Sequence, residues 1–374
     1  TVPDGGLRCR KEAELRQANP REQDFGDTKQ SPEVNIRAKD FTAYRDTHVC
    51  IAWCEKSSRF WKKMEEGGVS KPVAVIACTA MAFFYVAILY APTLILRLPP
   101  PASFKSFMIR RFICAGVSSL VSVIVCALIL PIRSWEVSHL FGVYGIRLDH
   151  IWQAVVFPLS LTSLMYAGSL VLKSLLLLNS LKEHWNCGGD HSFDCIKSVL
   201  QKFTGWMFSI ASDVSAWRNY FVAPLTEELV FRACMIPLLL CGGFKTYSVI
   251  FFCPVFFSLA HLNHLLELYT QQNFSLLKAS MVVGLQVGYT VVFGSYASFL
   301  FIRTGHLTAP LVAHIFCNIM GLPALYSRTK GMVCVTFIAG MVSFLWLLFP
   351  LTRPDLYNGR TDKCWCWHRY CAWN

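Results

Sequence analysis

Long apolar stretches recur along most of this 374-residue chain and constrain its fold more than any other feature. A stretch of at least about 17 mostly apolar residues is long enough to cross a membrane as a helix. Such stretches fall at residues 73–96, 112–130, 151–178, 219–240, 247–262, 279–302, 307–322 and 333–350. The pattern predicts an all-α, polytopic membrane protein with a bundle of about eight transmembrane helices.

Charge is unevenly distributed and divides the chain into three parts. Only 16% of the residues are charged, whereas about 25% is usual in a soluble domain. Residues 1–71 hold about half of the Asp and Glu, and we expect them to form a polar, disordered segment. Residues 72–355 form the predicted membrane-embedded domain, and residues 356–374 form a short tail rich in Cys and Trp.

Basic charge and abundant cysteine do not change this interpretation. The net charge of +12 comes largely from Lys and Arg in short loops between apolar stretches, which is typical of juxtamembrane sequence. We therefore expect no nucleic-acid partner. Many of the sixteen cysteines lie inside the apolar stretches, where Cys behaves as a small buried hydrophobe rather than a disulfide partner.

Two carboxylates and an arginine lie inside one of the most apolar stretches of the chain. A charge in hydrocarbon costs several kcal/mol unless it is paired or hydrated. Glu228 and Arg232 are four residues apart, so they share a helix face and predict a structural ion pair. Glu227 points about 100° away and is the candidate catalytic carboxylate, although a polar cluster that joins helices is the alternative. Pro224 is expected to open this helix, whose N-terminus would favour an ionised Glu227.

Two further polar pairs lie in later apolar stretches. Phe257 and His261 share one helix face, as do His314 and Asn318. Alone, His261 fits a membrane interface, and the second pair fits hydrogen bonding between helices. Beside Glu227, however, an imidazole indicates acid/base chemistry, and His314 with Asn318 could donate hydrogen bonds to an oxyanion.

Substrate contacts and metal ligands are less clearly indicated. Arg303 lies in a short polar turn, where it could meet an anionic group of a substrate or simply form an interfacial loop, and Phe257 is a second candidate for substrate binding. Glu227, His261 and His314 are residue types that can bind zinc. Neither histidine has a second ligand four residues on, as in His-Glu-x-x-His helices, so we expect no metal and no other cofactor.

Taken in order, these motifs resemble those of the eukaryotic type II CAAX prenyl endopeptidases, the Ras-converting members of the glutamate intramembrane protease family. That family's pattern is Glu-Glu-x-x-x-Arg, then Phe-x-x-x-His, then His-x-x-x-Asn, and this chain matches every motif position. Residues 218–219, 223–235 and 293–307 are similar to the eukaryotic members in particular. The resemblance covers roughly residues 72–355.

The resemblance implies an enzyme that removes the last three residues of proteins, such as small GTPases, whose CAAX cysteine is farnesylated or geranylgeranylated. It implies a multi-pass protein of the endoplasmic reticulum membrane, surrounded by lipid, with helices enclosing a polar, conical cavity. In the implied metal-free mechanism, Glu227 and His261 activate a water while His314 and Asn318 stabilise the oxyanion. The residue types alone leave open whether Glu227 or His261 is the immediate base.

Two other classes of function are compatible with polar residues in a membrane. A proton-coupled transporter would spread ionisable groups through the membrane, whereas here they gather in three short motifs. A non-enzymatic scaffold that binds prenylated proteins would not need Glu227 and Asn318 together.

Overall fold

The computed structural model describes residues 69–130, 137–186, 200–201, 204–205, 207–260, 269, 275–322 and 331–357. Every regular element within these ranges is a helix, which confirms the predicted all-α class. The predicted N-terminal segment and C-terminal tail lie almost entirely outside the described residues, so their boundaries stay predictions.

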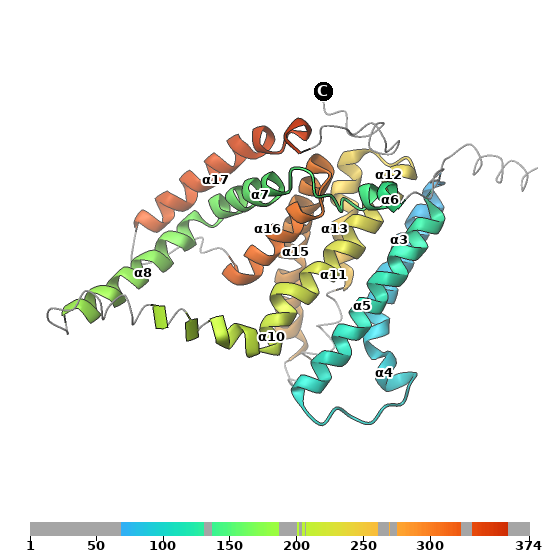
Figure 1. Ribbon diagram of the computed structural model, residues 1–374, viewed down its shortest axis with the longest axis horizontal. Helices are drawn as coiled ribbons and strands as arrows, with labels where there is room; N and C mark the ends of the chain where they lie inside the picture. The colour runs from blue at the N-terminus through green and yellow to red at the C-terminus, as the bar shows by residue number, and fades with distance from the viewer. Residues whose placement is uncertain are drawn as a thin grey trace, which may run out of the picture. The chain divides into compact units, whose positions relative to one another are not determined.

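Two long helices near the start of the described chain pack side by side (Figure 1). The first, α3 (Lys71–Ala87), has a proline in its first turn and continues through η1 (Ile88–Tyr90) and α4 (Ala91–Leu94). The second, α5 (Phe104–Ile129), is capped by the Ser103 hydroxyl, which accepts from the Ser106 amide. The buried face of α5 is rich in small Ser, Ala and Cys side chains, which let membrane helices approach closely.

The predicted span at residues 151–178 is not one straight helix. It is divided into α7 (Ile151–Met165) and α8 (Ala167–Asn186), which are bent by 80° relative to each other. Tyr166 lies between them with φ −101° and ψ 12°, and its hydroxyl donates to the Gly321 carbonyl at 2.8 Å. This contact with a distant part of the chain accompanies the bend, which an apolar stretch alone does not specify.

Close packing against this bend depends on a glycine of α17 (Gly331–Leu351). A Cβ at Gly340 would overlap the Leu164 carbonyl oxygen and lie 2.6 Å from the Ala167 Cβ. We expect Gly340→Ala to lower the free energy of unfolding by about 1–3 kcal/mol, because the helices must move apart. Thermal unfolding in detergent measures this change. Gly116→Ala is the matched control, since nothing lies within 4 Å of that Cβ, and equal stability of the two variants would contradict the packing.

Four described helices are long and apolar enough to cross a membrane, or five if the bent pair α7–α8 is one span. They include α15 (Leu276–Thr304), which ends at Gly305 in the left-handed conformation, φ 66°. Two other apolar helices, α13 (Thr246–Ala260) and α16 (Thr308–Met320), are shorter than the roughly 20 residues that a span needs. Two further short helices are α6 (Val137–Val143) and η4 (Pro354–Leu356).

The motif with two glutamates lies on one continuous helix that runs from Val214 to Cys241. Its α-helical parts are α10 (Val214–Trp217), α11 (Ala223–Glu228) and α12 (Met235–Cys241), joined by the π-helical turns η2 (Arg218–Val222) and η3 (Leu229–Cys234). A π-helical turn precedes each part that contains a proline. Proline lacks an N–H and crowds the preceding turn, so a wider turn lets the helix continue past it. The prediction that Pro224 opens this helix is therefore wrong, because the chain is already helical before it.

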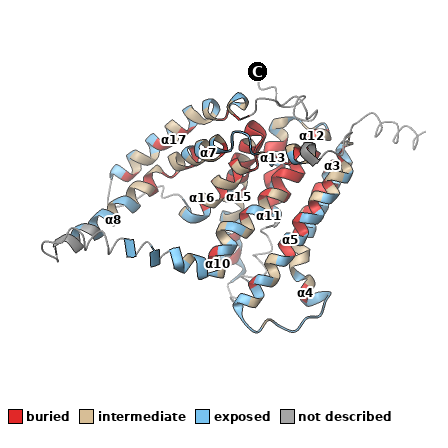
Figure 2. Ribbon diagram, in the orientation of Figure 1, coloured by how far each residue is buried: buried red, intermediate tan, exposed pale blue. Residues whose placement is uncertain are grey.

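Burial concentrates on the helices around this motif (Figure 2). Residues 230–240 are all buried, and α13 and α15 pack against each other beside them. By contrast, large apolar side chains such as Phe83, Leu128 and Trp346 are exposed on α3, α5 and α17. Exposed apolar surface on this scale suits hydrocarbon rather than water. The eight cysteines in the described residues are free thiols, most of them buried, in line with their apolar surroundings.

Candidate active site

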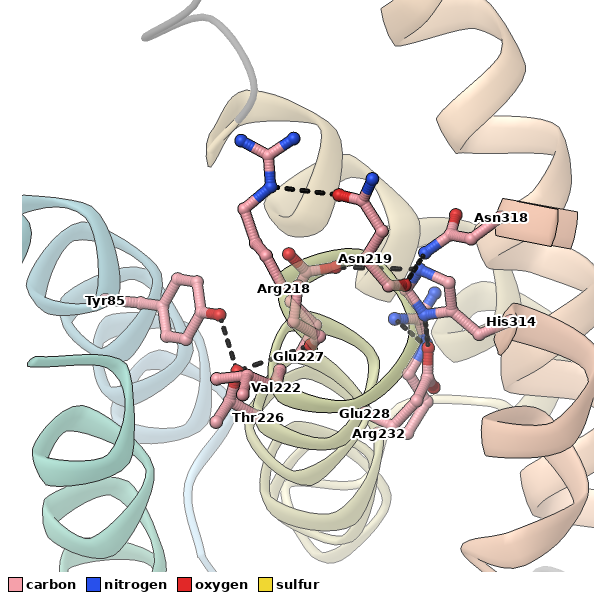
Figure 3. A network of polar contacts seen from close by, with 11 residues as sticks. Tyr85, Arg218, Asn219, Val222, Thr226, Glu227, Glu228, Arg232, His314 and Asn318 are labelled. Carbon is pink, nitrogen blue, oxygen red and sulfur yellow. Dashed lines mark hydrogen bonds and ion pairs between the residues drawn. The ribbon is translucent and has the colours of Figure 1, made fainter. Parts of the chain in front are cut away.

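Glu228 and Arg232 form a fully buried ion pair (Figure 3). Glu228 Oε1 lies 3.1 Å from Arg232 Nη1, and both side chains have 0% exposure. The Arg232 guanidinium lies over the Phe257 ring, 4.6 Å from its centroid. Among the described residues, its nitrogens make no directed hydrogen bond, so charge and the aromatic face hold it in place.

His314 of α16 joins the two glutamates. Its Nδ1 is 2.7 Å from Glu228 Oε1, and its Nε2 is 3.8 Å from Glu227 Oε2. A ring nitrogen that donates to a carboxylate fixes the orientation of the imidazole, as in other acid/base sites. Glu228 therefore does more than balance Arg232, because it also directs the second nitrogen of His314 toward Glu227.

Glu227 is the more accessible of the two carboxylates. Its side chain is 18% exposed, while that of Glu228 is fully buried. The structure does not support the predicted influence of a helix N-terminus on Glu227. The helix is capped by Asp213 and is already helical through Val222, so the amide groups near Pro224 are not the free N–H groups of a first turn.

Asn318 lies one turn beyond His314, and its side chain is exposed. Its Nδ2 donates to the main-chain carbonyl of Asn219 at 2.8 Å, and the Asn219 side chain accepts from Arg218 Nε at 2.9 Å. Sequence reasoning missed Asn219 as the partner of Asn318. The similarity of residues 218–219 to the eukaryotic members was the signal that could have suggested a role for this pair.

A second contact missed by sequence reasoning comes from α3. The Tyr85 hydroxyl lies 2.9 Å from Thr226 Oγ1, and Thr226 in turn donates to the Val222 carbonyl at 2.7 Å. The contact ties α3 to the helix at the residue before Glu227. Nothing in the sequence indicates it, because the partners are 141 residues apart.

Three other residues are predicted to belong to the site: Phe257, Arg303 and His261. Phe257 is buried, with its ring centroid 5.1 Å from that of Phe231 and 6.3 Å from that of His314. Arg303 is buried against α17, where its Nη2 donates to the Phe349 carbonyl at 3.4 Å. Substrate binding by Phe257 and Arg303 stays a prediction. His261 lies outside the described residues.

No group of three His, Cys, Asp or Glu side chains in the described ranges is arranged to hold a metal ion. Because His261 is outside those ranges, the predicted metal-free mechanism stays a prediction.

Comparison with known proteins supports the resemblance seen in the motifs. A family model described as type II CAAX prenyl endopeptidase Rce1-like matches residues 211–320, which contain all three motifs. CAAX prenyl protease 2 of Arabidopsis thaliana is 61% identical over 306 residues, covering 82% of this chain and 98% of that protein. The human CAAX prenyl protease 2 is 36% identical over 292 residues, covering 76% and 83% respectively. No solved structure matches the chain.

The chain therefore belongs to the type II CAAX prenyl endopeptidase family, and it is a membrane protein and a protease. This membership favours the enzyme over the transporter and the non-enzymatic scaffold.

Proposed function

We propose that this protease removes the C-terminal tripeptide from prenylated CAAX proteins in the endoplasmic reticulum membrane. The observation that carries the proposal is the placement of Glu227 beside an imidazole that a buried carboxylate orients. That arrangement places a candidate general base beside an oriented imidazole that can donate to an oxyanion, which suits attack of a water on a peptide carbonyl. The names of the relatives supply the substrate class, and farnesylated or geranylgeranylated proteins such as small GTPases fit it.

In the proposed mechanism, Glu227 takes a proton from water with the help of His261, and the resulting hydroxide attacks the scissile carbonyl. The developing oxyanion is stabilised by His314 and Asn318. Because His314 Nδ1 faces Glu228, a second donation from Nε2 to the oxyanion requires the doubly protonated ring. Glu228 and Arg232 act as the structural support of this group. No metal or other cofactor takes part.

The proposed surroundings are a multi-pass bundle of eight helices around a polar, conical cavity within the lipid. This count exceeds the four or five membrane-capable helices of the described residues. The short helices α13 and α16, with flanking residues, and the continuous helix from Val214 to Cys241 would have to contribute to it. Chemical labelling of single introduced cysteines in the connecting loops, from each side of the membrane, would measure the number of spans.

Release of a tripeptide tests the function directly. Membranes that contain the chain should release the last three residues of a farnesylated CAAX peptide, detected by mass spectrometry, but not of the unprenylated peptide. A strong chelator should leave the rate unchanged. Removal of single residues would contradict the proposal. Activity lost to the chelator and restored by zinc would make Glu227, His261 and His314 metal ligands instead.

Asn318→Ala is expected to reduce turnover of the prenylated peptide by about 10²–10³-fold, as for loss of one oxyanion donor. The KM should change far less, because the donor acts mainly in the transition state. Steady-state kinetics separate the two effects. A large rise in KM with turnover preserved would instead make Asn318 a residue that binds the ground-state substrate.

A further inference from the structure

Arg218 is an exposed cation at the edge of the candidate active site. Its Nε donates to the Asn219 side chain at 2.9 Å, and Asn219 is its only polar partner within the described part of the chain. Both terminal nitrogens of the guanidinium therefore remain available. The guanidinium is oriented through its Nε, and its two terminal nitrogens have no protein partner among the described residues. Such an arginine is well suited to bind a carboxylate with two parallel hydrogen bonds.

Two hydrogen bonds and one helix turn connect Arg218 to the proposed catalytic residues. The main-chain carbonyl of Asn219 accepts from Asn318, and His314, one turn before Asn318, faces Glu227. Figure 3 shows the side chains of Arg218 and Glu227 extending to the same side of their helix in this view. The arginine thus belongs to the same polar group as the proposed oxyanion donors.

The spacing along the helix matches the length of the leaving peptide. Arg218 precedes Glu227 by nine residues on one continuous helix. This corresponds to about 13 Å along the axis at the α-helical rise, and to somewhat less because Arg218–Val222 is a wider π-helical turn. Three extended residues, from the scissile carbonyl to the terminal carboxylate, span about 10–11 Å. A substrate whose scissile carbonyl lies at Glu227 can therefore place its terminal carboxylate within reach of the Arg218 side chain.

We propose that Arg218 binds the free α-carboxylate of the substrate's last residue, with Asn219 fixing the orientation of the guanidinium. The inference rests on the proposed function and adds a positioning residue to it. It supplies a physical reason for the removal of three residues, because the carboxylate is anchored at a set distance from the attacking water.

Two farnesylated peptides of the same sequence, one with a free C-terminal carboxylate and one with a C-terminal amide, test the proposal. We expect the wild-type protein to cleave the acid about 10–100-fold better in kcat/KM, as for loss of a hydrogen bond to a charged group. Arg218→Gln should bring the ratio of acid to amide cleavage close to one, because only the acid loses the contact with its carboxylate. Arg218→Lys should restore part of the preference, since it keeps the charge but not the fork.

The ratio of the two rates within each variant does not depend on how much protein folds. Arg353→Gln is the matched control, because Arg353 is an exposed arginine paired with Asp355, and this variant should keep the wild-type ratio. Equal slowing of acid and amide by Arg218→Gln would overturn the proposal and indicate a contact with lipid phosphate or with the protein itself. A wild-type protein that cleaves both peptides equally would also overturn it, whereas cleavage of neither would refute the proposed function and this inference with it.

Discussion

Glu227→Gln is expected to lower the rate of tripeptide release by at least about 10²–10⁴-fold, which is the usual contribution of a general base. Glutamine keeps the shape of the side chain but cannot accept a proton from water. Glu227 is partly exposed and does not share the ion pair with Arg232, so the change should leave the fold intact. Single-turnover cleavage of a farnesylated peptide measures the loss.

Two measurements separate a catalytic from a structural effect of this substitution. The unfolding midpoint of Glu227→Gln in detergent should stay close to that of the wild type. Asp355→Asn is the control for removal of a carboxylate, because Asp355 is exposed and pairs only with Arg353 among the described residues. A well-folded Glu227→Gln protein with near-normal turnover would refute the assignment of Glu227 as the base.

Substitution of either member of the buried ion pair is expected to cost about 3–5 kcal/mol of stability, because it leaves an uncompensated charge. The structure also predicts that the two losses are unequal. Arg232→Ala leaves Glu228 with its contact to His314 Nδ1, whereas Glu228→Ala leaves Arg232 with the Phe257 ring. Glu228→Ala should therefore be the less stable variant, and it should also lose the orientation of His314.

A double-mutant cycle on the free energy of unfolding tests this pair. Replacing Glu228 by Leu and Arg232 by Met together should cost less than the sum of the two single changes, because no lone charge remains. The amount of protein in membranes should follow the same order. A coupling energy near zero would mean that the residues do not stabilise each other, and Glu228 would then be reconsidered as a second acid/base group.

The sequence by itself determined the helical class, the membrane setting and the family. Long apolar stretches require helices in a membrane, since every backbone polar group must be paired within the segment. It also determined the contact between Glu228 and Arg232, because residues four apart on one helix face each other whatever surrounds them.

Only the tertiary structure decided the contacts between helices. Helical periodicity places neighbours within about one turn, but it does not specify how one helix is rotated against the next. Pairing of His314 with Glu228, donation from Asn318 to Asn219 and the contact of Tyr85 with Thr226 all depend on that rotation. The continuous helix past Pro224 and the bend at Tyr166 likewise depend on local backbone turns and distant packing, which an apolar pattern leaves open.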